Sequence, residues 1–381
     1  MRIGIVLYPT FGGSGVVATE MGHELAKLGH SIHFISYKRP ARLEYFAPNI
    51  QFHQVNVADY PLFEFAPYET ALSGRIVDVA MKYDLDLIHV HYAIPHATAA
   101  LLAKQILHTK GKDIPVITTL HGTDITMVGR DPYLEPSVTW AINSSDAVTA
   151  VSRSLRDETL TNFHIHREIE VIYNFIDPGL YGIPSENCLR GQIAPNGEKV
   201  IVHLSNFRKV KRIPDVIEVF YRIRQAMPAK LIMAGDGPER AEAELKVKNL
   251  GIEDDVSFLG SIKSANDVLA CADLLLLLSE KESFGVSALE AMVSGVPVIA
   301  SNAGGMPEVQ ENGVTGYMCD VGDVESMGTK AIFILSDEER LAKFRAGARK
   351  KAEEFSTDRI IRQYEDLYKR VLAKKEKSPV L

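Results

Sequence analysis

Short, continuous runs of apolar and β-branched residues alternate with amphipathic segments from one end of this 381-residue chain to the other. Runs that are apolar at every position, and not only at every second one, are typical of strands buried on both faces of a parallel sheet. Eleven such runs predict strands at residues 3–8, 32–37, 85–91, 116–120, 147–151, 169–173, 200–204, 230–234, 256–259, 274–278 and 298–300.

The segments between these runs have helical periodicity. In the first of them Val17, Met21, Leu25 and Leu28 recur at spacings of four and three, and Gly29 follows as a C-terminal cap. A similar pattern occupies residues 216–223. Strand–helix alternation of this kind predicts a doubly wound α/β fold. Because the pattern occurs twice, we expect two Rossmann-like domains that face each other across a cleft.

A stretch rich in turn residues and poor in apolar ones separates the two patterns, with Asp177-Pro178-Gly179 near its start and Pro195-Asn196-Gly197 near its end. It predicts an N-terminal domain over residues 1–175, a linker over 176–198 and a C-terminal domain over 199–357. Residues 358–381 predict a final helix, which packs back on the N-terminal domain, and a basic tail that is a solvated end. Ligands of open α/β sheets bind at the carboxyl ends of the strands, so we look for chemistry there.

Charge and composition exclude several classes of protein. The chain has 42 basic and 49 acidic residues, and residues 1–174 alone hold 14 basic and 18 acidic ones, which argues against nucleic-acid binding and a basic, membrane-bound first domain. No secretory signal and no apolar run of membrane-spanning length is visible. Three widely spaced cysteines fit a reducing compartment without disulfides, with Cys271 as a small core residue. These observations predict a cytoplasmic enzyme, and they leave its oligomeric state open, a homo-oligomer included.

The first candidate motif is Gly12-Gly13-Ser14-Gly15, which follows the first strand and opens the first helix. Glycines let the backbone approach a ligand, and the free amides of a helix N-terminus favour an anion. The spacing is not that of a dinucleotide fingerprint, which disfavours a nicotinamide cofactor. A tight turn without a ligand remains the alternative.

The second motif places Glu282 and Glu290 eight residues apart, around Ser283, Phe284 and Gly285. If both carboxylates lie along one helix, about 12 Å separates them at 1.5 Å per residue, close to the reach from the sugar to the ribose of a nucleotide-sugar. The amides between them would then meet the diphosphate. The alternative is an acid that stabilises the helix dipole and a second acid that faces solvent.

The third motif is the basic loop Arg208-Lys209-Val210-Lys211-Arg212, directly after the first strand of the second domain. Such cations can stabilise the charge that develops on a leaving diphosphate, although a solvated turn is the alternative. Histidines gather at strand ends in the first domain, among them His89, His91 and His121, without a recognisable metal-ligand spacing. We therefore expect no metal and no cofactor, and we expect His121 to face the cleft.

Together these motifs resemble those of the retaining glycosyltransferases of family 4, which have the GT-B fold. The resemblance rests on the order and separation of the Gly12–Gly15 loop, His121, Lys211, the turn 235–239 and the Glu282/Glu290 pair, and it covers essentially the whole chain. More narrowly, the chain is similar to members that transfer N-acetylglucosamine from its UDP donor (UDP-GlcNAc) to the hydroxyl of L-malate, the first step of bacillithiol biosynthesis. Both molecules would be substrates.

The resemblance implies a role for each matching residue. Glu290 is expected to hold the ribose, Lys211 the diphosphate, and Glu282 the transferred sugar near its contact with His121; Lys211, Glu282 and His121 are the expected catalytic residues. The full expected donor site consists of Gly13, Asn206, Arg208, Lys211, Gly260, Ser261, Ile262, Glu282, Ser283, Phe284, Gly285, Val286 and Glu290. Asn206 stands where many members have arginine, and Ser283 stands where glycine is usual.

Malate is a small dianion, so its pocket needs hydrogen-bond donors or cations. We expect Ser14, Arg42, Tyr92 and Thr123 to supply them, although Arg42 is equally well placed to be a surface residue. Two alternatives remain open: a family-4 enzyme that uses another small polar acceptor, such as an inositol phosphate or a sugar, and a UDP-sugar-binding protein without turnover.

Overall fold

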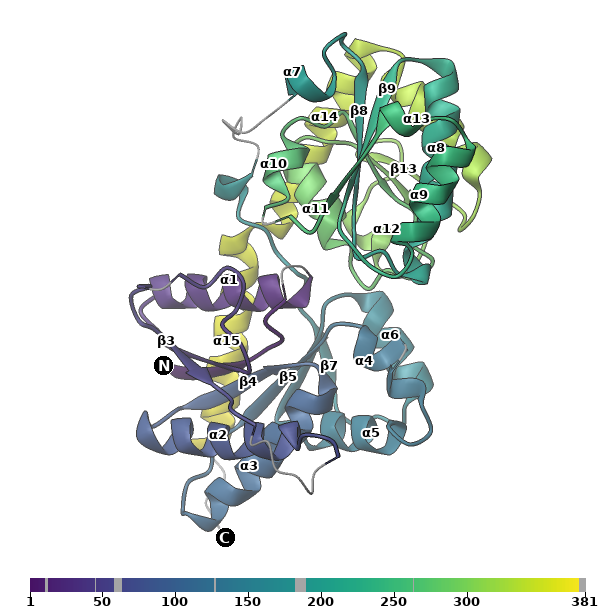
Figure 1. Cartoon of the computed structure of the whole chain (residues 1–381). Coiled ribbons are helices and arrows are strands. Elements are labelled where there is room, and N and C mark those ends of the chain that lie inside the picture. Colours follow the sequence, from purple (N-terminus) through teal and green to yellow (C-terminus); the bar gives the residue numbers. More distant parts are fainter. Residues whose placement is uncertain are drawn as a thin grey trace. The chain divides into compact units, whose positions relative to one another are not determined.

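The computed structural model describes residues 1–10, 13–44, 46–57, 64–126, 128–181, 190–262 and 264–376. The chain forms two compact units, Met1–Asn174 with Asp358–Leu381 (unit 1) and Phe175–Thr357 (unit 2). Each unit has its own parallel sheet with helices on its faces (Figure 1). The segment predicted as a linker belongs to unit 2 in its described parts, and residues 182–189 lie outside the described residues.

Unit 1 contains a seven-stranded parallel sheet in the order β3-β2-β1-β4-β5-β6-β7. Its strand order reverses between β1 and β4, which is the point where open α/β sheets bind ligands. The strands are β1 (Arg2–Val6), β2 (Ser31–Ser36), β3 (Ile50–Gln54), β4 (Leu87–His91), β5 (Val116–Leu120), β6 (Ala147–Ala150) and β7 (Ile169–Val171).

Unit 2 contains a six-stranded parallel sheet in the order β10-β9-β8-β11-β12-β13, which reverses between β8 and β11. This is the strand order of the dinucleotide-binding Rossmann fold. The strands are β8 (Lys199–Leu204), β9 (Ala229–Ala234), β10 (Val256–Gly260), β11 (Leu274–Leu277), β12 (Val298–Ser301) and β13 (Gly316–Cys319).

The helices follow their strands along the chain. In unit 1 they are α1 (Ser14–Lys27), α2 (Tyr68–Lys82), α3 (Thr98–Thr109), α4 (Thr123–Thr126), α5 (Glu135–Ser144), α6 (Arg153–Asn162) and α15 (Thr357–Glu376). In unit 2 they are α7 (Arg190–Ile193), α8 (Ile213–Ala226), α9 (Arg240–Asn249), α10 (Asn266–Leu269), α11 (Val286–Val293), α12 (Met306–Val309), α13 (Val324–Leu335) and α14 (Glu338–Ala352). None of these described helices is long and apolar enough to span a membrane.

Two Rossmann-like sheets confirm the predicted fold class, and all eleven predicted strands are present. The prediction missed β3 and β13, two of the edge strands of the sheets. Most side chains of both strands are at least partly exposed to solvent, and β3 alternates apolar with polar residues. The criterion of a continuous apolar run therefore found all the central strands and two of the four edge strands, β7 and β10.

The C-terminal helix α15 packs in unit 1, although most of unit 2 precedes it in the chain (Figure 1). Tyr368 is fully buried, and its hydroxyl lies 2.7 Å from Nδ1 of His89 in β4. Tyr364 and Leu367 are also buried, which gives the helix a continuous apolar face. The last helix therefore completes the core of unit 1.

The cysteines differ from expectation. Cys319 is a half-buried free thiol, whereas Cys271 is disulfide-bonded. The prediction of a chain without disulfides is therefore wrong for Cys271.

Candidate active site

The strongest grouping of predicted residues in unit 2 lies where its strand order reverses. Lys211 follows β8 in the 3₁₀ turn Lys209–Lys211, and Glu282 follows β11. Nζ of Lys211 donates a 2.7 Å hydrogen bond to Oε2 of Glu282. The two loops are also joined by the backbone, since the Glu280 amide donates to the Val210 carbonyl at 2.8 Å. Tertiary structure thus pairs two residues that are 71 positions apart.

This ion pair is largely sheltered, because the Lys211 and Glu282 side chains are only 18% and 15% exposed. Ser279 donates a further hydrogen bond to the same carboxylate oxygen at 3.3 Å. Burial of both partners strengthens their attraction and restricts their motion. A nucleotide-sugar that binds here has to meet a cation and a carboxylate held side by side.

The two glutamates of the second motif do not lie along one helix, which corrects the spacing argument made from the sequence. Helix α11 begins at Val286, so Glu290 is helical whereas Glu282 belongs to the preceding loop. The rise of 1.5 Å per residue therefore does not apply between them. The Glu290 carboxylate accepts a 2.8 Å hydrogen bond from the hydroxyl of Tyr181, a residue outside the predicted site.

The loop between the glutamates is shaped by close backbone approaches. Gly285 has φ +99°, which favours glycine, and it caps the N-terminus of α11. The Phe284 ring is buried edge-on against Phe355, at 5.6 Å between centroids, so only its backbone is available to a ligand. The Gly305 amide donates to the Glu282 carbonyl at 2.8 Å. Ser283 and Val286 complete this loop and are half-buried.

The remaining predicted donor residues of unit 2 lie at neighbouring strand ends. Gly260 ends β10, and its carbonyl accepts the Gly235 amide at 2.8 Å, while exposed Ser261 and half-buried Ile262 follow. Both Asn206 and Arg208 are exposed after β8. All these positions share the carboxyl edge of the sheet. The Lys211 amide donates to the Arg208 carbonyl at 2.8 Å, and the Arg208 amide donates to the Asn206 carbonyl at 2.8 Å. Among the described residues, no side-chain hydrogen bond or ion pair joins Asn206 or Arg208 to the Lys211–Glu282 pair.

In unit 1 two of the four predicted acceptor residues, Ser14 and Tyr92, also meet where the strand order reverses. Gly13 caps α1 after β1, with φ +60°, and Ser14 is the first helical residue. The Ser14 and Tyr92 hydroxyls share a 2.6 Å hydrogen bond, although β1 and β4 deliver them from 78 residues apart. The Tyr92 ring lies 5.1 Å from that of His121 between centroids. Ser14, Tyr92 and His121 therefore form one cluster of side chains.

His121 follows β5 and is half-buried, with Nε2 2.8 Å from Nδ1 of His91. Burial lowers the pKa of His121 to about 3, so its imidazole is neutral at physiological pH. A neutral imidazole donates one hydrogen bond and accepts another, which suits contact with a sugar hydroxyl.

Asp124 is a second residue that the prediction missed, although it directly follows the predicted residue Thr123. Its carboxylate is buried and accepts hydrogen bonds from the amides of Ala93, at 2.8 Å, and Gly122, at 3.1 Å. Burial raises its pKa to about 6, against the opposing effect of these amides. Asp124 thereby fixes the loop that carries His121 to the loop that carries Tyr92.

The two other predicted acceptor residues are not joined to this cluster by any described contact. Thr123 is exposed at the start of α4. The Arg42 guanidinium lies 3.4 Å from a carboxylate oxygen of Glu20 in α1. Glu20 is six residues from Ser14, or about 9 Å along the helix. Arg42 is thus a neighbour of the cluster through α1 and not a member of it.

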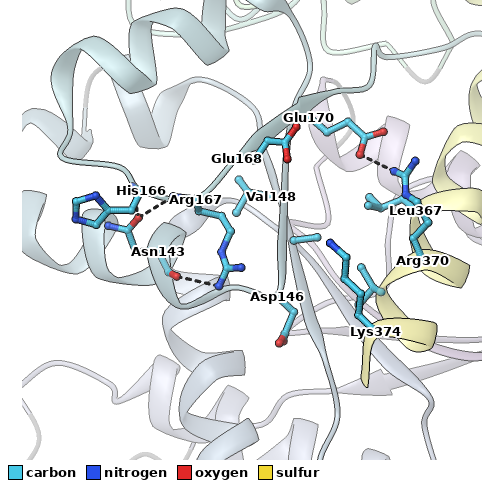
Figure 2. A pocket seen from close by; sticks show the side chains of 12 residues that line it. Asn143, Asp146, Val148, His166, Arg167, Glu168, Glu170, Leu367, Arg370 and Lys374 are labelled. Carbon is cyan, nitrogen blue, oxygen red and sulfur yellow. Dashed lines mark hydrogen bonds and ion pairs between the residues drawn. The ribbon is translucent and has the colours of Figure 1, made fainter. Parts of the chain in front are cut away.

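A pocket of about 620 Å³ also lies in unit 1, between β6, β7 and α15 (Figure 2). Asp146 and Glu168 line it and directly precede β6 and β7, so it opens at the amino ends of these parallel strands. Arg370 of α15 pairs with Glu170 at its wall (Figure 2). It contains none of the predicted site residues, and the predicted ligand edge is the opposite one.

Comparison with known proteins agrees with this arrangement. Residues 11–180 match the family model described as Glycosyltransferase Family 4, and residues 187–351 match the model described as Glycosyl transferases group 1. The chain is 47% identical over 374 residues, 98% of its own length and 97% of its relative's, to an N-acetyl-alpha-D-glucosaminyl L-malate synthase of Bacillus anthracis. The chain belongs to glycosyltransferase family 4. A more distant relative, an uncharacterized glycosyltransferase of Methanocaldococcus jannaschii, is 27% identical and covers 97% of this chain and 98% of its own.

Solved structures share the fold of this family-4 glycosyltransferase. A sucrose-phosphate synthase from Thermosynechococcus elongatus superposes with a TM-score of 0.80 at 19% identity, covering 98% of this chain and 99% of its own. Anabaena Alr3699/HepE, solved with UDP and glucose, gives 0.79 at 21% identity over 96% and 98% of the two chains. Both likenesses confirm the GT-B fold that the sequence predicted.

The two clusters described above consist of side chains and backbone amides. No group of three or more His, Cys, Asp or Glu residues that could hold a metal ion occurs within the described part of the chain. The expectation of a reaction without a metal stays a prediction, to be tested by metal removal.

Proposed function

We propose that the chain transfers N-acetylglucosamine from UDP-GlcNAc to the hydroxyl of L-malate with retention of the α configuration, the first step of bacillithiol biosynthesis. One observation carries this proposal: the 47% identity, over nearly the whole of both chains, to a protein named for synthesis of N-acetyl-α-D-glucosaminyl L-malate. The pairing of Lys211 with Glu282, and of Ser14 with Tyr92, supports it, since each pair lies where ligands of its sheet are expected.

In the proposed reaction the bond from the sugar C1 to the diphosphate oxygen breaks, and a bond from C1 to the malate hydroxyl oxygen forms on the same face. The hydroxyl proton passes to the departing phosphate of UDP. Lys211 would exchange its contact with Glu282 for the diphosphate and stabilise the charge that develops there. Glu282 and the amides of Phe284 and Gly285 would then hold the sugar, whose C6 hydroxyl would contact His121.

The rest of the donor would be held by backbone and carboxylate groups. Glu290 would bind the ribose hydroxyls, with Tyr181 sharing its carboxylate. Gly260, Ser261 and Ile262 would meet the uracil, and Gly13 would meet the phosphates through the free amides of α1.

The acceptor site is proposed around the Ser14–Tyr92 hydroxyl pair, with Arg42 and Thr123 beside it. Arg42→Ala should raise the KM for malate and leave that for UDP-GlcNAc unchanged, since only the dianion needs the extra cation. Arg75→Ala is the matched control, because Arg75 pairs with Asp78 on the surface of α2. Equal malate KM values for all three proteins would remove Arg42 from the site.

The decisive experiment measures UDP release from UDP-GlcNAc by the purified chain, with and without L-malate. Malate-dependent release with an α-glucosaminyl malate product, identified by the anomeric proton coupling in NMR, supports the proposal. Release only with another acceptor, such as an inositol phosphate, keeps the glycosyltransferase and refutes malate. Stoichiometric binding without any release in an acceptor screen refutes turnover. A cytoplasmic location remains a prediction that cell fractionation tests.

A further inference from the structure

Four histidines of unit 1 cluster at the carboxyl ends of β4 and β5: His89, His91, His96 and His121. The rings of His89 and His91 stack at 4.7 Å between centroids, and those of His91 and His121 at 5.1 Å. Three of the four are buried, whereas His121 is half-buried. The rings of His89, His91 and His121 therefore form a column that ends at the residue proposed to contact the sugar.

The contact between the last two rings is a hydrogen bond between neutral groups. Nδ1 of His91 lies 2.8 Å from Nε2 of His121. Burial lowers the pKa of His121 to about 3 and that of His91 well below its usual value. One nitrogen must therefore donate and the other accept, which leaves two arrangements of the protons.

The other nitrogen of His91 distinguishes the two arrangements. Nε2 of His91 is buried and has no hydrogen-bond partner among the described residues. If His91 accepted from His121, its own proton would stand on Nε2 as a buried N–H without an acceptor, which native structures rarely tolerate. If His91 donates from Nδ1, Nε2 is only an unused lone pair, a less costly defect.

The backbone around the pair is fixed from both sides. Nδ1 of His96 lies 2.5 Å from the carbonyl oxygen of His91, which accepts a hydrogen bond from it. Asp124 ties the Gly122 amide, next to His121, to the Ala93 amide beyond Tyr92. The separation of the two rings is therefore set by buried contacts and not by a mobile side chain.

We infer that His91 is a positioning residue, which donates from Nδ1 to Nε2 of His121 and so keeps the proton of His121 on Nδ1. His121 then offers an N–H donor, not an acceptor, to its ligand. Nδ1 of His121 makes no hydrogen bond within the described structure, so it is available for that purpose. The contact with the sugar rests on the proposed function, whereas the proton positions do not.

The direct test is NMR of the full chain labelled with ¹⁵N-histidine, in which the chemical shifts of the two ring nitrogens report the tautomer. The His121 signal is assigned from its loss in His121→Asn. We expect the Nδ1–H tautomer in the wild type and a change towards Nε2–H in His91→Leu, which has no donor. An Nε2–H tautomer in the wild type, or an unchanged tautomer in His91→Leu, overturns the inference.

Matched variants separate positioning from folding. His91→Asn places an amide donor near the position of Nδ1 and should keep the wild-type tautomer of His121. His33→Leu is the control, because His33 is similarly buried in the same sheet, in β2, but its Nδ1 lies 2.9 Å from Nε2 of His53 and no described contact joins it to His91 or His121. It should lower stability and leave the His121 tautomer unchanged.

Activity provides an independent readout. With UDP-GlcNAc and malate, His91→Leu should lose about 10- to 100-fold in kcat/KM, the range seen when a residue that orients a ligand-binding imidazole is removed. His91→Asn should recover most of that loss. Equal activities of the two variants would refute the role in positioning. If the wild type itself releases no UDP, the proposed function fails, and the NMR measurement still decides the tautomer.

Discussion

The Gly305→Ala substitution tests whether the loop between Glu282 and Gly285 holds the donor sugar. Gly305 is buried at the N-terminal end of α12 and has φ −80°, so alanine brings no backbone strain. Its Cβ would lie 2.5 Å from the Ser283 carbonyl oxygen and 3.1 Å from Cα of Phe284. Ordinary contact begins at 3.4 Å, so the Ser283 backbone has to retreat by about 0.9 Å.

Ser283 lies between the groups proposed to bind the sugar, which are the Glu282 carboxylate and the amides of Phe284 and Gly285, so its displacement moves them as well. A displacement of about 1 Å in a group that positions a substrate can cost about 10²-fold in rate. We therefore expect kcat/KM for UDP-GlcNAc to fall about 100-fold in Gly305→Ala. Overpacking of this kind should also lower the free energy of unfolding by about 1–3 kcal/mol, which leaves a folded protein to assay.

The assay is UDP release at saturating malate, with thermal unfolding measured on the same samples. Gly191→Ala is the matched control: it makes the same chemical change in the same unit, and nothing lies within 4 Å of the added Cβ. It should keep wild-type kinetics and be slightly more stable, as is usual for Gly→Ala in a helix. A folded Gly305→Ala protein with kcat/KM within about threefold of wild type would refute the assignment of this loop to the donor site.

Three further predictions concern Lys211, Tyr181 and two buried histidines. Lys211→Met should lower kcat by about 10²- to 10³-fold, because the developing phosphate charge loses its cation; a variant that loses less than tenfold would assign that role to another group. Tyr181→Phe should raise the KM for UDP-GlcNAc about tenfold through the lost hydrogen bond to Glu290, and an unchanged KM in steady-state assays would contradict this. Burial lowers the pKa of His96 and of His203 to about 4, so each stays neutral when folded but protonates near pH 6.5 when unfolded. The unfolded state then binds more protons than the folded state. Each of the two histidines should therefore lower the free energy of unfolding by about 1–2 kcal/mol as the pH falls from 7 to 5. Denaturant midpoints that do not change over this pH range would refute this.

The sequence predicted the two sheets because their central strands carry their own signal. Ile3, Ile5 and Val6 are completely buried in β1, and β11 is buried and apolar along its whole length. Strand β4 is also buried throughout, although two of its five residues are histidines. Strand β3 was missed because its residues alternate between apolar and polar, whereas the search was for continuous apolar runs. Strand β13 was missed because it is only four residues long and begins with glycine.

The candidate site was predicted less evenly. Lys211, Glu282, Ser14 and Tyr92 stand at strand ends that are visible in the sequence, and the structure brings each pair together. The placement of Glu282 in a helix was wrong. Gly285, with φ +99°, is the N-cap of α11, so the helix begins only after Gly285, which itself lies three residues beyond Glu282.

What the sequence alone determined is the class of fold and the edge of each sheet where ligands bind, since both follow from local periodicity and from the rule that parallel strands present their carboxyl ends together. Only the tertiary structure decided the partners within each site. Tyr181 and Glu290 are 109 residues apart, and Asp124 is 31 residues from Ala93. Such contacts leave no periodic trace in the chain, because each depends on how separate loops meet once the sheet has formed.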